Sequence, residues 1–355
     1  MIDAILCSNC FMDQGLRLDS SRIGVQENSP CRNCGSLNGT KLDRKLVEEL
    51  AYRFFDFGSL YRPAYGAFPL LIFNEHQYQK GHMEFPPWLQ NDVKLIEEAL
   101  KIGFIHYGPR AWMFGDIEPL NELQDAAKRP EVIGRILKEY PSRLLAEATP
   151  FYRLRKNPAH PSQPEEYDSP PYDHLGKGRL ESATCSILYG SQDLEVCIHE
   201  CRTTVEDEMY VATLVPVKDL KLLDLTELLE EDTTEFESLD HAVQMLFLAG
   251  AHSYEISRAI ATSAYQGGFD GLIYPSYFSL LRTGARPFDT IYGISIRRIP
   301  ELNELVRSQV IGNLAIFGKP IEEGKVMVRC INRLQLSRVG YDVCFGPVLD
   351  GCFGE

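Results

Sequence analysis

Two closely spaced pairs of cysteines at the start of the chain constrain its fold more than any other feature. Cys7 and Cys10 form the first pair and Cys31 and Cys34 the second, with twenty residues between the pairs. A Cys-x2-Cys turn brings two thiolates to one ion, and four thiolates suit a tetrahedral zinc site. This spacing predicts a zinc ribbon over residues 1–40, with hairpin strands linking the two turns. The alternative is four unrelated core cysteines, which the repeated spacing disfavours.

A site with four thiolates has no open coordination position, so a zinc ion here would stabilise the fold and would not catalyse. Ribbons often bind nucleic acid or protein, but this segment has few basic residues, namely Arg17, Arg22 and Arg32. We therefore expect a structural Zn²⁺ in a module that can dock another surface.

The composition is that of a globular protein. The 355 residues are 44% hydrophobic and 24% charged, which excludes disordered, collagen-like and coiled-coil chains. The formal charge of −14 argues against nucleic acid or an anionic membrane as the main partner.

Targeting signals are not evident in the sequence. It has no run of about 18 uncharged apolar residues and no basic start typical of a secretory signal. Ten cysteines without such a signal favour a reducing compartment, and a cytoplasmic location is expected.

Hydrophobic spacing predicts a mainly helical N-terminal domain over residues 41–148. Helices are expected over 41–58, 91–104 and 130–147, and Asn91 or Asp92 is expected to cap the second of them. Residues 59–88 are rich in proline, glycine and aromatic residues, which predicts irregular structure or short strands.

The pattern changes near residue 149, where a domain of mixed α and β structure is expected to begin and to continue to 330. Strands are predicted at 151–155, 186–189 and 209–214, helices at 190–202 and 236–265, and a buried strand after GGFDG. The end of the chain, from 310 to 348, is predicted to form more strands, with 331–355 as a C-terminal strand extension that covers a sheet edge or forms a dimer edge. The expected fold class is α+β.

The common catalytic motifs are absent: there is no Walker A sequence, no GxGxxG after a strand, no GxSxG and no HExxH. What remains is a dispersed set of residues in the last two hundred positions, each of which taken alone is more typical of a surface or core position. This set consists of Arg153, Arg155, Arg179, Tyr189, Glu200 and Ser276.

Taken together, however, these residues lie in segments that resemble the RES domain family. The segments, in order, are FYRLR (151–155), GKGR (176–179), SILYGSQDLEVCIHECR (186–202), GGFDGLIYPSY (267–277) and NLAIFGKP (313–320). The Arg, Glu and Ser that give the family its name correspond here to Arg153, Glu200 and Ser276. The chain departs from the family at GKGRLES, where GGRWN is usual, and by about 36 inserted residues at 277–312.

The resemblance implies a curved or split sheet of the ADP-ribosyltransferase type, preceded by the zinc ribbon and helical extension of longer RES proteins. It also implies NAD⁺ as substrate, because the best-known RES proteins are toxins of toxin–antitoxin pairs that destroy NAD⁺. On that basis Glu200 would stabilise positive charge on the ribose, and Arg153, followed by Arg179, would bind the diphosphate. Tyr189 would stack on the nicotinamide or ribose, and Ser276 would contact the nicotinamide amide or position Glu200.

Several questions stay open at this level. The acceptor would be water, phosphate or a protein side chain, so the activity would be that of a glycohydrolase, a phosphorylase or a protein ADP-ribosyltransferase. The alternative from another class is an inactive RES-like binding module whose ribbon docks nucleic acid or protein. An antitoxin or the N-terminal domain would restrain a toxin, and a homo-oligomer is compatible with the sequence.

Overall fold

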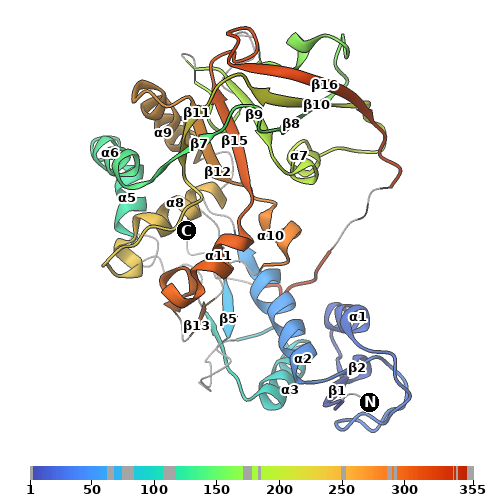
Figure 1. The fold of residues 1–355 in the computed structure, drawn as a ribbon. Coiled ribbons are helices and arrows are strands. Elements are labelled where there is room, and N and C mark those ends of the chain that lie inside the picture. The colour runs from blue at the N-terminus through green and yellow to red at the C-terminus, as the bar shows by residue number, and fades with distance from the viewer. Residues whose placement is uncertain are drawn as a thin grey trace.

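The structure is a computed structural model, and it describes most of the chain (Figure 1). The described residues are 3–61, 68–73, 84–106, 117–170, 178–182, 185–248, 253–285, 290–291, 294–338, 340 and 343–349. None of the described helices is long and apolar enough to cross a membrane.

The N-terminal segment holds the cysteines on a different scaffold from the one expected. Strand β1 (Leu6–Cys7) pairs with β2 (Lys41–Leu42) in antiparallel fashion. The chain between the cysteine pairs contains helix α1 (Gln14–Ile23) and not the hairpin strands of a ribbon. Asp13 explains why a helix starts here, because its carboxylate accepts a hydrogen bond from the Leu16 N–H at 2.9 Å.

The expected helices over 41–58 and 91–104 are present with shifted ends. Helix α2 (Arg44–Ala51) continues through a π-helical turn (Tyr52–Asp56) and a 3₁₀ turn (Phe57–Ser59), and α3 spans Gln90–Leu100. The predicted cap of α3 is wrong, since Leu89 occupies the cap position. Asp92 instead lies buried in the first turn, where its carboxylate accepts hydrogen bonds from the Met12 and Asp13 N–H groups.

Two small hairpins complete this N-terminal part. They pair β3 (Leu60–Tyr61) with β4 (Phe68–Pro69) and β5 (Leu71–Phe73) with β6 (Phe104–His106). The core between these hairpins and the helices is aromatic; Phe55 contacts Phe54, Phe85 and Phe104 with ring centroids 4.2–5.9 Å apart.

A curved eight-stranded sheet forms the larger part, in the order β16-β10-β8-β9-β15-β12-β11-β7. Only β11 and β12 are parallel; every other neighbouring pair in this sheet is antiparallel. The fold is therefore α+β, as predicted. The strands are β7 (Ser142–Leu145), β8 (Phe151–Lys156), β9 (Ile187–Ser191), β10 (Met209–Pro216), β11 (Leu220–Asp224), β12 (Gly271–Pro275), β15 (Gly312–Phe317) and β16 (Val326–Leu334).

Helices pack around this sheet (Figure 1). The largest hydrophobic core joins one face of the sheet to residues of α5, α6, α8 and α9. The 277–312 segment forms α10, the short strands β13 and β14, and α11. The helices are α5 (Glu118–Gln124), α6 (Arg129–Glu139), α7 (Leu194–Glu200), α8 (Leu239–Leu248), α9 (Tyr254–Gln266), α10 (Ser279–Thr283) and α11 (Asn303–Gln309), and the short strands are Thr290–Ile291 and Ile294–Ser295.

The boundary predicted at 148 is misplaced, because residues before it belong to the larger part. Val132 and Ile136 of α6 share the sheet core with Leu246 and Ile260. The predicted helix over 130–147 ends at Glu139, and β7 follows it and pairs with β11 at the sheet edge. The N-terminal unit therefore stops before α5.

The predicted C-terminal strands are also only partly present. Strand β16 ends at Leu334, and the described residues after it are not in strands. Residues 343–349, called here the C-terminal tail, lie instead against the N-terminal part. The Phe345 N–H donates to the buried carboxylate of Asp19 at 3.1 Å, and Arg22 Nη1 donates to the Val343 carbonyl at 2.6 Å.

Candidate active site and cysteine cluster

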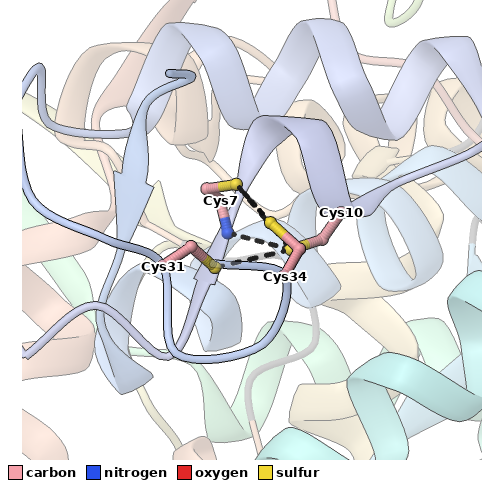
Figure 2. Close-up of side chains that lie close together, drawn as sticks. All are labelled: Cys7, Cys10, Cys31 and Cys34. Atoms are coloured by element: carbon pink, nitrogen blue, oxygen red, sulfur yellow. Dashed lines mark hydrogen bonds between the residues drawn. The ribbon is translucent and has the colours of Figure 1, made fainter. Parts of the chain in front are cut away.

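The four predicted cysteines converge on one point (Figure 2). Their sulfur atoms all lie within 4.8 Å of one another. Cys7 Sγ is 3.7 Å from Cys10 Sγ and 3.5 Å from Cys34 Sγ, and Cys10 Sγ is 3.6 Å from Cys31 Sγ. Four sulfurs at zinc–sulfur distances of about 2.3 Å in a tetrahedron are separated by about 3.8 Å. The residues therefore fit a tetrathiolate metal site.

The surroundings of the cluster also suit thiolates. Cys10 Sγ accepts hydrogen bonds from the Cys7 N–H and from Asn33 Nδ2, both at 3.4 Å. Burial raises the pKa of the Cys10 thiol in the absence of an ion, and a bound cation would oppose that effect. The ammonium of Lys41 is fully buried and donates to the carbonyls of residues 36, 37 and 38, so it fixes the loop after the second cysteine pair.

A separate cavity of about 730 Å³ lies over the middle strands of the large sheet. All six residues of the set singled out in the sequence are near it. Ser276 hydrogen-bonds Glu200, and the other five line the cavity, namely Arg153, Arg155, Arg179, Tyr189 and Glu200. The volume lies in the range of small-molecule sites. Of the predicted GKGR turn, Gly176 and Lys177 fall outside the described residues.

Glu200 is the exposed carboxylate of this cavity, and its position is fixed from two sides. It is the last residue of α7, whose start is capped by Asp193. Its Oε1 accepts hydrogen bonds from Ser276 Oγ at 2.7 Å and from Asn313 Nδ2 at 2.6 Å. Its Oε2 accepts none from the described residues, so the protein holds one oxygen of a carboxylate that lines the cavity and leaves the other without a donor.

Ser276 and Asn313 reach Glu200 from neighbouring strands. Ser276 directly follows β12, and its hydroxyl oxygen also accepts a bond from the Phe278 N–H at 3.1 Å, which directs its proton to Glu200. Asn313 lies on β15, next to β12 in the sheet. Sequence reasoning missed Asn313, although it is the first residue of the NLAIFGKP segment. Both side chains are buried.

Arg153 is buried beneath the cavity and already bonded. Its Nη1 donates to the Tyr189 carbonyl at 2.8 Å and its Nη2 to the Asp168 carbonyl at 2.9 Å. Burial, followed by the charge of Arg155, lowers the pKa of Arg153 to about 10. The guanidinium thus joins β8 to β9 and to the turn at Asp168.

Arg179 also lines the cavity, on a short loop held by several contacts. Its guanidinium faces the ring of Tyr254 at 5.0 Å and donates to the Leu246 carbonyl at 3.2 Å. Arg258, which the sequence did not single out, donates twice to the Gly178 carbonyl and so holds this loop. The loop is close-packed, since a Cβ at Gly178 would lie 2.8 Å from the Tyr189 hydroxyl.

Tyr189 contributes its hydroxyl to the same loop. The hydroxyl oxygen accepts a hydrogen bond from the Leu180 N–H at 3.0 Å, and burial raises its pKa. The phenol therefore lies under the Arg179 loop, with the buried Tyr274 and the half-buried Tyr254 also on the cavity wall.

Part of the chain is similar to a known protein family. Residues 150–284 match the family model of the RES domain. This segment of the chain is therefore similar to a RES domain. The match ends inside the 277–312 segment, but the domain's sheet continues, because β15 lies between β9 and β12.

A solved structure was also found to be similar to the chain, the MbcT–MbcA toxin–antitoxin complex of M. tuberculosis. The similarity covers 57% of this chain and 91% of that chain, with 13% identity and a TM-score of 0.30. A likeness at this level carries no conclusion about the chain. No protein with a curated description matches it.

Proposed function

We propose that this protein cleaves the nicotinamide–ribose bond of NAD⁺, as a glycohydrolase or a phosphorylase, and acts as a toxin or defence effector. The observation that carries the proposal is Glu200, which lines a cavity together with arginines and tyrosines and has one oxygen fixed by Ser276 and Asn313. The match to the RES domain supports the same chemistry.

The proposed reaction uses this carboxylate electrostatically. As the C1′–N bond of NAD⁺ breaks, its electron pair leaves with nicotinamide and positive charge develops on the ribose. A fixed carboxylate close to that ribose stabilises the charge without having to reorganise. An oxygen of the acceptor then bonds to C1′; water gives ADP-ribose and a proton, whereas phosphate gives the phosphorylated ADP-ribose.

The remaining parts of the proposal concern the metal and the partners. Cys7, Cys10, Cys31 and Cys34 would hold a structural Zn²⁺, which would stabilise the N-terminal part and supply no catalytic chemistry. An antitoxin or other regulatory protein would restrain the enzyme in the cytoplasm. Transfer to a protein side chain, or an inactive binding module that docks protein or nucleic acid, are the alternatives.

The test is a nicotinamide-release assay on the zinc-loaded full chain, with and without inorganic phosphate. Glu200→Gln is expected to lower kcat by about 10²–10³-fold, the loss typical of one removed electrostatic stabiliser. Glu195→Gln is the matched control, because Glu195 lies on the same helix but pairs with Arg282 outside the cavity. A phosphate-dependent rate would identify a phosphorylase.

The proposal is contradicted if the protein neither cleaves nor binds NAD⁺. If folded wild-type protein releases no nicotinamide under either condition, and calorimetry detects no NAD⁺ binding, the cavity has another use. Release of nicotinamide only when a target protein is added would favour protein ADP-ribosylation.

A further inference from the structure

Two further arginines, Arg155 and Arg202, line the same cavity. The sequence placed Arg155 in the candidate set without a role and did not single out Arg202. Arg155 lies two residues after Arg153 on β8, on the same face of the strand. Arg202 follows the end of α7, two residues after Glu200. Within the described part of the chain, neither guanidinium donates a hydrogen bond or forms an ion pair. In this respect both differ from Arg153.

Among the described residues, four arginines and one glutamate, Glu200, line the cavity, so the charge of its lining is positive. Two acidic side chains that follow Arg202 in the sequence are paired with other cations. Asp207 pairs with Lys156 at 3.3 Å, and Glu208 pairs with Arg333 at 3.1 Å. Unneutralised guanidiniums in a cavity of a chain whose formal charge is −14 create a local positive potential. Such an arrangement becomes favourable when an anion binds, because arginine donates paired hydrogen bonds to phosphate oxygens.

The backbone of Arg202 gives an independent reason to assign its side chain a role. Its φ is +47°, in the left-handed region that usually holds glycine at the end of a helix. Its N–H donates to the His199 carbonyl at 3.0 Å and closes α7, a role that needs no side chain. A residue other than glycine whose backbone keeps this strained conformation at a cavity wall is typical of a functional position.

The position of the two arginines relative to Glu200 suits one part of NAD⁺. The Cα atoms of Glu200 and Arg202 are at most about 7 Å apart, and β8 lies two strands, about 10 Å, from β15, which carries Asn313. In NAD⁺ a single ribose separates the nicotinamide bond from the diphosphate. A ligand whose ribose lies at Glu200 therefore places its diphosphate within reach of Arg155 and Arg202. Arg179, by contrast, is engaged with the Tyr254 ring and the Leu246 carbonyl.

We infer that Arg155 and Arg202 form the diphosphate subsite of the cavity, while Arg153 is a positioning residue. This inference rests on the proposed function, since it takes NAD⁺ as the ligand. It predicts that the two side chains contribute to binding of the whole dinucleotide and not to the breaking of the glycosidic bond.

The experiment compares Arg155→Met and Arg202→Met with Arg333→Met as the control. Methionine keeps an apolar stem without the charge, and Arg333 is an exposed arginine of β16 outside the cavity. Calorimetry with ADP-ribose, which keeps the diphosphate and lacks nicotinamide, measures binding without turnover. Each cavity variant is expected to raise the Kd for ADP-ribose and the KM for NAD⁺ by about tenfold or more, with kcat nearly unchanged. Turnover of nicotinamide riboside, which has no phosphate, is expected to stay at the wild-type rate.

Arg202→Gly separates loss of the guanidinium from loss of the fold. Glycine removes the backbone strain, so this variant is expected to melt no lower than wild type and yet to bind ADP-ribose as weakly as Arg202→Met. If the wild type cleaves NAD⁺ and the cavity variants behave like Arg333→Met, this inference is overturned and the proposed function stands. If the wild type neither binds ADP-ribose nor cleaves NAD⁺, both are overturned.

Discussion

Replacement of Asn313 by alanine tests how the carboxylate of Glu200, proposed above as catalytic, is held. Asn313 Nδ2 and Ser276 Oγ donate to the same oxygen of Glu200, at 2.6 and 2.7 Å. A hydrogen bond to a charged group contributes about 1.5–3 kcal/mol, and each 1.4 kcal/mol corresponds to about a tenfold change in rate. If the bond is needed in full when charge develops on the ribose, Asn313→Ala should lower kcat for NAD⁺ cleavage by about 10- to 100-fold.

The double variant makes this test sharper. Because both donors act on one oxygen, loss of the first already frees the carboxylate to rotate, and loss of the second should cost less. Ser276→Ala, Asn313→Ala and the double variant are compared by nicotinamide release, with Asn332→Ala on β16 as the control. Thermal unfolding shows whether each variant is folded. Wild-type kcat in Asn313→Ala, or fully additive effects in the double variant, would refute the argument that the two donors fix one catalytic position.

Three further predictions concern the metal, the pH dependence and the C-terminal tail. Cys10→Ser should lower the bound zinc measured by atomic absorption from one equivalent toward zero and should lower the melting temperature of the N-terminal part. Burial, followed by the charge of Arg297, lowers the pKa of His241 to about 4, below its unfolded value near 6.5. The free energy of unfolding should therefore fall as the pH drops from about 6.5 to about 4. In urea titrations His241→Asn should weaken this pH dependence, and an unchanged dependence would contradict the assignment. Gly346→Val should release the tail, because a Cβ there would lie 2.0 Å from the Gly58 carbonyl oxygen, and faster proteolysis of the tail with unchanged NAD⁺ turnover is the expected result.

The α+β class and most elements of the segment that matches the RES domain could be predicted because their signals are local. FYRLR alternates as β8 does, and the apolar spacing before Glu200 predicts α7. The position of β7 could not be predicted, because it depends on pairing with β11, some eighty residues later in the chain. A four-residue strand directly after α6 has no periodicity that separates it from the helix end.

The residues of the candidate site could likewise be predicted only in part. Short motifs identified Glu200 and Ser276, but nothing local shows that Asn313 completes their hydrogen bonds across two strands. The sequence likewise could not show which arginines of the cavity donate hydrogen bonds to the protein and which do not. Arg153 and Arg155 are equivalent in a strand pattern. They differ in the structure because Arg153 donates hydrogen bonds to the carbonyls of Tyr189 and Asp168.

The contact between the C-terminal tail and α1 has a consequence for how the protein responds to proteolytic nicking. The tail brings Leu349 to the N-terminal core and Phe345 to Asp19, 326 positions away. A cut between β6 and α5 would thus produce two fragments that each hold part of the other's packing surface. Such a nicked protein should elute as one species in gel filtration and separate into two bands only under denaturing conditions. The two fragments are therefore suited to complementation experiments, in which separately produced pieces are mixed and reassociate.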